Sequence, residues 1–177
     1  MAVNFSLLVW GGFALVLAWA VGAYGRLNRL RDQMVRSRSS MLKYAGMYQG
    51  LCNENPLLQG ADPGSQLLLA LHGAVGVLQK PLADWEKDAR NQQAAKAFGT
   101  ALDAVQTGIE TLAAAPDDLA GACWPQEERT RWTELAADVR IRRCRYNVQV
   151  GELREAAEQM PASLMARITG TLPWMEV

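Results

Sequence analysis

The sequence predicts an all-α protein in which an N-terminal transmembrane helix continues into an antiparallel three- or four-helix bundle. Three observations support this prediction: an uncharged stretch from Phe5 to Gly25, seven-residue apolar repeats further along the chain, and a composition rich in helix-forming residues. Outside the first stretch Ala, Leu, Gln, Glu and Arg dominate, and runs of β-branched residues, which favour strands, are nearly absent. The rest of the 177 residues suffices for one domain of ordinary size.

The stretch from Phe5 to Gly25 holds 21 residues without a charge. As an α-helix rising about 1.5 Å per residue it would cover roughly 30 Å, which is the hydrocarbon thickness of a bilayer. No Lys or Arg precedes it, which argues against a cleaved signal peptide and against a prepilin leader. Its small residues predict a close-packing face for homo-oligomerisation, formed by Gly11, Gly12, Ala14, Ala18 and Gly22.

Basic residues follow this stretch. Between positions 26 and 43 there are six of them against one acid, Asp32. The positive-inside rule therefore predicts a short extracytoplasmic N-terminus at 1–4, a single span at 5–25 and a cytoplasmic bundle at 26–177. We expect the basic residues to meet anionic lipid headgroups at the membrane surface. They are Arg26, Arg29, Arg31, Arg36, Arg38 and Lys43.

The span is expected to run on as one helix to about Asn53, because no Pro or Gly cluster interrupts it. Two interleaved seven-residue series predict the stripe along which this helix packs on its partners. The first series is Leu27, Met34, Met41 and Tyr48, and the second is Leu30, Ser37, Tyr44 and Leu51.

The middle of the chain predicts a loop at 53–64 and then a second helical region from about Gly64 to Ala115. The apolar series in this region changes phase between Trp85 and Phe98, across a polar stretch. Because Pro81 also lacks the N–H that an interior helical position needs, we expect a kinked or broken hairpin here.

A further loop leads to Pro125, which is suited to open the last helix, with Glu127 and Glu128 in its first turn. The seven-residue repeat is most regular in this helix, which should end before Pro161. Its members are Trp132, Val139, Tyr146, Leu153 and Met160, interleaved with Ala136, Arg143, Val150 and Ala157. Arg143 is the polar exception, for which two interpretations stay open: its head reaches solvent, or it pairs with an acid on a neighbouring helix.

The last helix resembles the LemA family of bacterial membrane proteins. The resemblance rests on the run from Arg142 to Asn147 and on the later sequence Gln-Met-Pro-Ala-Ser-Leu-Met-Ala at 159–166. The segment from Tyr24 to Arg31 is similar to the start of the family. The positions that match the family signature are Arg143, Tyr146, Asn147, Pro161, Leu164 and Ala166.

This resemblance implies a single-pass protein of the bacterial inner membrane with a cytosol-facing antiparallel bundle, no catalytic site and no cofactor. It further implies a scaffold or adaptor that acts in membrane remodelling or in the organisation of envelope proteins. The expected partners are the lipid bilayer and other membrane proteins, among them envelope proteases.

The histidine, cysteine and arginine residues predict no metal, catalytic or nucleic-acid site. His72 is the only histidine, so metal sites that need several imidazoles are excluded. A signalling or phosphotransfer module that uses His72 is the alternative function, although Leu71 and Val75 make its surroundings apolar. The three cysteines lie at no metal-like spacing, and a bridge between Cys52 and Cys123 is a minor possibility. The arginines of the last helix lack the interleaved exposed aromatic residues of a nucleic-acid surface, so no nucleic-acid partner is expected.

Overall fold

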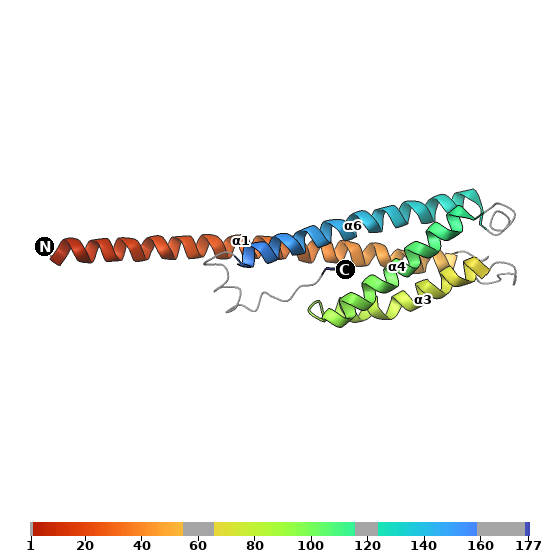
Figure 1. Ribbon diagram of the computed structural model, residues 1–177, viewed down its shortest axis with the longest axis horizontal. Coiled ribbons are helices and arrows are strands. Elements are labelled where there is room, and N and C mark those ends of the chain that lie inside the picture. Colours follow the sequence, from red (N-terminus) through yellow and green to blue (C-terminus); the bar gives the residue numbers. More distant parts are fainter. Residues whose placement is uncertain (1, 55–65, 116–123, 159–175) are drawn as a thin grey trace.

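The computed structural model describes residues 2–54, 66–115, 124–158 and 176–177, with side chains from Val9 onward. The described residues form helices and no strand, which confirms the all-α prediction. The helices are α1 (Ala2–Glu54), α3 (Gln66–Lys87), α4 (Gln92–Ala114) and α6 (Gln126–Glu158). Successive helices run in opposite directions and pack as an antiparallel bundle, from which the N-terminal part of α1 projects (Figure 1).

Helix α1 is continuous over 53 residues, a length of about 80 Å. Within the bundle it packs most extensively on α6. The first predicted series, Leu27, Met34, Met41 and Tyr48, is buried. The second series is half-buried and flanks it on the same face. The predicted packing stripe of this helix is therefore confirmed.

The predicted hairpin is formed by α3 and α4, which pack along each other. The chain turns at 88–91, where Asn91 caps α4 by accepting a hydrogen bond from the Ala94 backbone N–H at 3.0 Å. Pro81 lies inside α3, and the chain breaks after Lys87, within the polar stretch between the two apolar series. The carbonyl that Pro81 cannot bond belongs to Val77, on the exposed side of α3, where solvent can take the place of the missing donor.

Helix α6 begins directly after Pro125, as predicted, and Glu127 and Glu128 lie in its first turn. The Pro125 carbonyl accepts a hydrogen bond from the Arg129 N–H at 3.0 Å, which closes that turn. The described members of the main seven-residue series are buried, namely Trp132, Val139, Tyr146 and Leu153. Met160 and Pro161 lie outside the described residues.

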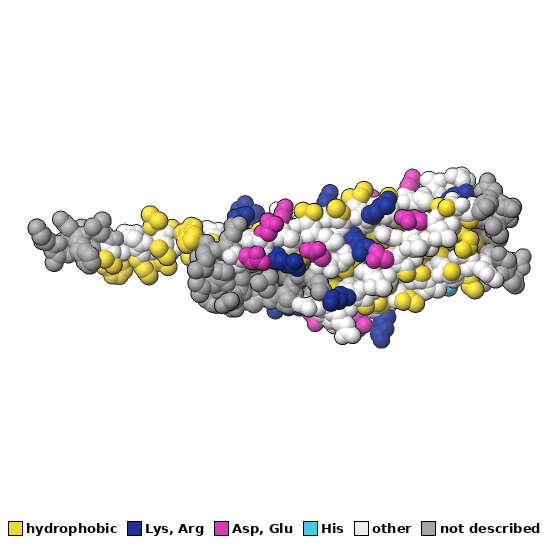
Figure 2. Space-filling view, in the orientation of Figure 1, with side chains coloured by type: hydrophobic (Ala, Val, Ile, Leu, Met, Phe, Trp, Pro, Cys, Tyr) yellow, Lys and Arg dark blue, Asp and Glu magenta, His cyan; other side chains and the backbone are white. Residues whose placement is uncertain are grey.

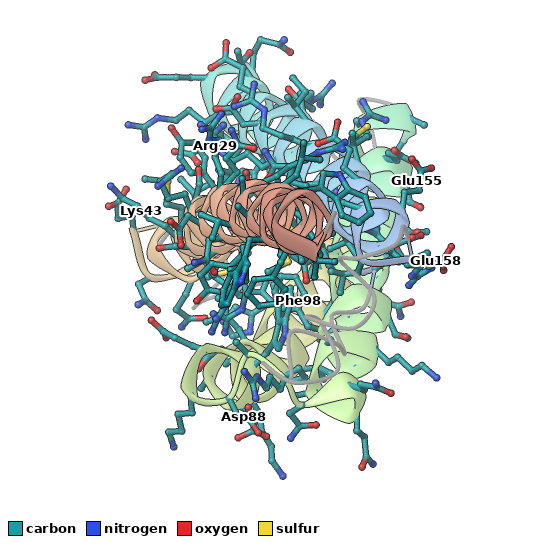
Figure 3. All side chains as sticks on the ribbon, turned by 90° about the vertical axis from the view of Figure 1, so that its left-hand side faces the viewer. Arg29, Lys43, Asp88, Phe98, Glu155 and Glu158 are labelled. Atoms are coloured by element: carbon teal, nitrogen blue, oxygen red, sulfur yellow. The ribbon has the colours of Figure 1, made fainter. Side chains whose placement is uncertain are left out.

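Large aromatic side chains hold the core of the bundle together. Tyr48 of α1 stacks on Trp132 of α6 with ring centroids 5.8 Å apart. Trp85 of α3 meets Phe98 of α4 at 5.1 Å and Tyr146 of α6 at 5.6 Å. Seen along the bundle, Phe98 lies near the centre, whereas charged residues such as Lys43 point outward (Figure 3). Apolar stripes from the helices thus meet in one core.

The N-terminal part of α1 presents apolar side chains to its surroundings (Figure 2). Trp10 is 68% exposed and Leu15 is 73% exposed. Among the described residues, however, no helix is both long enough and apolar enough to cross a membrane. The predicted span starts at Phe5, and the side chains of residues 5–8 lie outside the described part. The described residues do not support the transmembrane assignment of 5–25, which stays a prediction.

Candidate functional site

The segment from Arg142 to Asn147 on α6 presents its side chains to three different surroundings. Each residue of an α-helix is turned by about 100° from the one before it, so Arg143 and Asn147 share one side and Arg142 and Arg145 share another. Tyr146 lies between these two sides and is fully buried. The predicted signature residues Arg143, Tyr146 and Asn147 therefore lie close together but contact different partners.

Asn147 and Arg143 together hold the backbone of Val177. The Asn147 side-chain amide donates to the Val177 carbonyl at 2.7 Å, and its oxygen accepts from the Val177 N–H at 3.0 Å. Arg143 Nε donates to the same carbonyl at 2.6 Å. One primary amide carries both donors and an acceptor, so the Asn147 side chain can bond both main-chain groups of Val177. We call this arrangement the Val177 clamp.

Helix α4 completes the clamp with two residues four positions apart, Gly99 and Asp103. A Cβ at Gly99 would lie 3.3 Å from Val177 Cγ1 and 3.4 Å from its backbone carbon, so glycine permits the close approach. Both carboxylate oxygens of Asp103 accept from the Arg143 guanidinium. The Arg143 side chain is 23% exposed, so this pair between helices is neither fully buried nor free in solvent. Of the two open interpretations of Arg143, the structure shows the ion pair with a neighbouring helix.

Asn147→Ala should release Val177 from the clamp. The substitution removes two of the three hydrogen bonds, each worth about 0.5–1.5 kcal/mol net, so we expect the Val177 amide to exchange with solvent at least tenfold faster. Hydrogen exchange followed by NMR or mass spectrometry measures this effect. Val148→Ala, at the exposed neighbouring position, is the matched control. An unchanged exchange rate in Asn147→Ala would show that the clamp does not hold in solution.

Tyr146 belongs to a buried cluster with Trp85 and Arg38. Arg38 is 8% exposed, and its guanidinium lies 5.0 Å from the centre of the Trp85 ring. It donates to the backbone carbonyls of Trp85 and Glu86, at 3.3 Å in the second case. These carbonyls belong to the last turn of α3, where the helix dipole is negative and the final carbonyls lack partners within the helix. Arg38 of α1 thus caps the C-terminus of α3.

Burial sets the protonation behaviour of this cluster. Desolvation lowers the pKa of Arg38, and Tyr146, Glu86 and Asp88 oppose that shift. Even a lowered pKa leaves an arginine protonated at neutral pH. Desolvation raises the pKa of Tyr146 to about 12, although the charge of Arg38 opposes this. At neutral pH the cluster therefore holds one cation and a neutral phenol.

The predicted membrane-surface residues do not form a single surface. Arg26, Arg29, Arg36 and Lys43 are exposed and Arg31 is half-buried. Arg38 is buried in the bundle, so its assignment to the membrane surface is wrong. The seven-residue pattern could not reveal this, because the partner of Arg38 is the end of a helix far away in the sequence.

The remaining residues singled out from the sequence lie as follows. His72 is exposed on α3. Cys52 is a buried free thiol whose burial raises its pKa to about 11, and Cys144 is an exposed free thiol. Trp85, Trp124 and Trp132 are buried, as expected of core anchors. No group of acidic, His and Cys side chains suited to a metal is found within the described ranges. Cys123, Leu164, Ala166 and Trp174 lie outside those ranges.

Sequence reasoning missed Gly99, Asp103 and Val177. Gly99 carried a weak signal, because an interior helical glycine is unfavourable unless a close contact requires it. Comparisons of the chain with protein-family models, with curated proteins and with solved structures found no match. The resemblance to the LemA family stays a prediction that rests on the residues quoted above.

Proposed function

We propose that this chain is a non-enzymatic, single-pass membrane protein of the LemA type whose helical bundle acts as a scaffold for other membrane proteins. In this proposal residues 5–25 span the bacterial inner membrane, the bundle lies in the cytoplasm, and the partners are envelope proteins such as membrane proteases. The observation that carries the proposal is the continuity of α1, which joins an exposed apolar end to the core of the bundle without a break.

The distribution of apolar residues along α1 supports a lipid environment for its N-terminal end. A helix that packs on one protein face is apolar on one side only, whereas a helix surrounded by lipid is apolar all round. Large apolar side chains are exposed at nine positions from Val9 to Tyr24, and at 100° per residue they occupy about two thirds of the circumference. The small residues Gly11, Ala14, Ala18 and Gly22 fill the remaining third, so no side of this stretch is charged. Between Leu27 and Tyr48, in contrast, the large apolar residues face mainly the core.

Distances along α1 refine the role of the basic residues. The headgroup layer on each side of a bilayer is about 5–8 Å deep. At about 1.5 Å per residue, Arg26, Arg29 and Arg31 lie within roughly 9 Å of Gly25, whereas Arg36 lies about 16 Å beyond it. The first three are therefore the residues that we expect to contact anionic headgroups, each worth about 1 kcal/mol.

The span is tested by placing charges in its centre. The double variant Leu15→Arg/Val16→Arg should no longer insert into the membrane, because each arginine raises the free energy of insertion by about 2.5–3.5 kcal/mol at the centre of a span. Membrane fractions washed with alkaline carbonate measure this effect. Ile141→Arg/Val148→Arg, at exposed apolar positions of α6, is the matched control and should stay in the membrane. Extraction of the wild-type chain by carbonate would contradict the proposal.

Orientation and assembly need separate measurements. Reversing the charges at Arg26, Arg29 and Arg31 to Glu should invert or block insertion, as read by a topology reporter fused to the bundle.

Purification in mild detergent tests the scaffold itself, because a scaffold should elute with a defined partner or as an oligomer. A strictly monomeric particle without a partner would argue against this part of the proposal.

A further inference from the structure

The groove between α1 and α6 contains a pocket of about 180 Å³ lined by basic and hydroxyl side chains. This is many times the volume of about 15 Å³ that one water molecule needs. Two of its arginines lie on α6 and one on α1, so they come from helices that are far apart in the sequence. The lining residues are Arg36, Ser37, Ser40, Arg142 and Arg145, and none is acidic.

The three arginines have no counter-charge in the described part of the chain. The nearest acids along their own helices are Asp32 and Asp138, each four residues before an arginine, but neither lines the pocket. No hydrogen bond or ion pair joins Arg36, Arg142 or Arg145 to a described residue, and Arg142 Nε is buried without a partner. Two other arginines of the bundle differ, because Arg38 caps a helix end and Arg143 pairs with Asp103.

The guanidinium of Arg142 is held in place by Tyr44, since its carbon lies 3.5 Å from the centre of that ring. A guanidinium stacked face-on to an aromatic ring still has its N–H groups in its own plane. The planar fork of N–H donors matches the oxygen atoms of a phosphate group, and the two serines can donate further hydrogen bonds. A fixed arginine loses little conformational freedom when an anion binds, which favours binding.

We propose that this pocket binds a phosphate group. Arg36, Arg142 and Arg145 would supply the positive charge, and Ser37 and Ser40 would donate to phosphate oxygens. The group could belong to a soluble phosphorylated compound or to a phospholipid. The site lies about 16–22 Å beyond Gly25 along α1, farther than a headgroup layer extends, so the soluble source is expected. The existence of the site rests on the bundle alone, whereas the choice of a soluble source rests on the proposed membrane span.

Binding of inorganic phosphate and of pyrophosphate to the full chain in phosphatidylcholine nanodiscs tests the proposal. Isothermal titration calorimetry gives the affinity, and NMR signals of arginine side chains locate the site. We expect saturable binding that weakens about tenfold in Arg36→Gln, Arg145→Gln and Arg142→Lys, because each removes one charge-assisted contact or its fixed geometry. The serine variants Ser37→Ala and Ser40→Ala should weaken it a few-fold.

Lys43→Gln and Arg140→Gln are matched controls, since both basic residues are exposed on the same two helices outside the pocket. Unchanged helical content in circular dichroism shows that each variant is folded. A second arm uses nanodiscs that contain phosphatidic acid. If inorganic phosphate and pyrophosphate do not bind, but phosphatidic acid shifts the arginine NMR signals and the pocket variants abolish that shift, the site exists and its ligand is a lipid. Equal weakening in pocket and control variants, or no saturable binding in either arm, would overturn the proposal.

Discussion

Trp85→Ala should lower the free energy of unfolding of the bundle by about 3–5 kcal/mol, the range measured for truncation of a buried tryptophan. Trp85 is 1% exposed and contacts each of the other helices. Its ring meets Phe98 of α4 and Tyr146 of α6, and the guanidinium of Arg38 from α1 lies over it. Alanine would leave a cavity at the point where the helices meet, and the cavity adds to the lost apolar burial.

Denaturant unfolding of the full chain in mild detergent, followed by circular dichroism, measures this change. Trp19→Ala is the matched control, because Trp19 is exposed on the projecting part of α1 and does not belong to the core cluster. Its substitution should change bundle stability by less than about 0.5 kcal/mol. Equal effects of the two substitutions would mean that the described core is not the core that unfolds.

The fold could be predicted largely because its signals are local. A seven-residue repeat places its apolar members on one side of a helix whatever the helix packs against. Met34 and Met41 of α1, and Val139 and Tyr146 of α6, are buried for this reason. The turn at 88–91 was also indicated locally, by the polar stretch between two apolar series.

The functional contacts could not be predicted, because they depend on how far one helix is shifted along another. Arg38 and Arg36 are two residues apart on a basic segment, yet one caps α3 in the interior and the other lines the pocket with α6. The sequence offers the same residue type at both positions. The Val177 clamp could not be predicted for the same reason, since its three contributing segments are far apart in the sequence, at Gly99, Arg143–Asn147 and Val177.

The segment from Arg142 to Asn147 of α6 contains one residue whose burial the repeat predicts and others whose contacts it does not. Its inward member, Tyr146, was predicted from the repeat. The repeat placed Arg143 on the packing face and Arg142 off it, but it could not name their partners: Arg142 stacks on Tyr44 beside the pocket and Arg143 pairs with Asp103. A short motif can therefore serve two surfaces of one helix, and both surfaces meet at the buried tyrosine.

Arg38→Glu should destabilise the bundle by at least about 3 kcal/mol. The arginine lies in the interior and donates to carbonyls at the negative end of the α3 dipole, at Trp85 and Glu86. A carboxylate there would lose these hydrogen bonds, lie unpaired in a desolvated place and face oxygen atoms of like sign. Arg38→Met, which keeps an unbranched apolar stem but removes the guanidinium with its charge and donors, should cost less, about 1–3 kcal/mol.

The pH dependence of the Arg38→Glu variant separates electrostatics from packing. Burial and the facing carbonyls raise the pKa of the introduced carboxyl above its unfolded value of about 4.3. The folded state then binds its proton more tightly than the unfolded state, so stability is lost as the pH rises above that value and is regained below it. The deficit relative to the wild-type chain should shrink between about pH 7 and pH 4, whereas that of Arg38→Met should stay constant. Denaturant midpoints at both pH values measure this difference. Parallel deficits at both values would show that Arg38 acts through its volume and not through its charge at the end of α3.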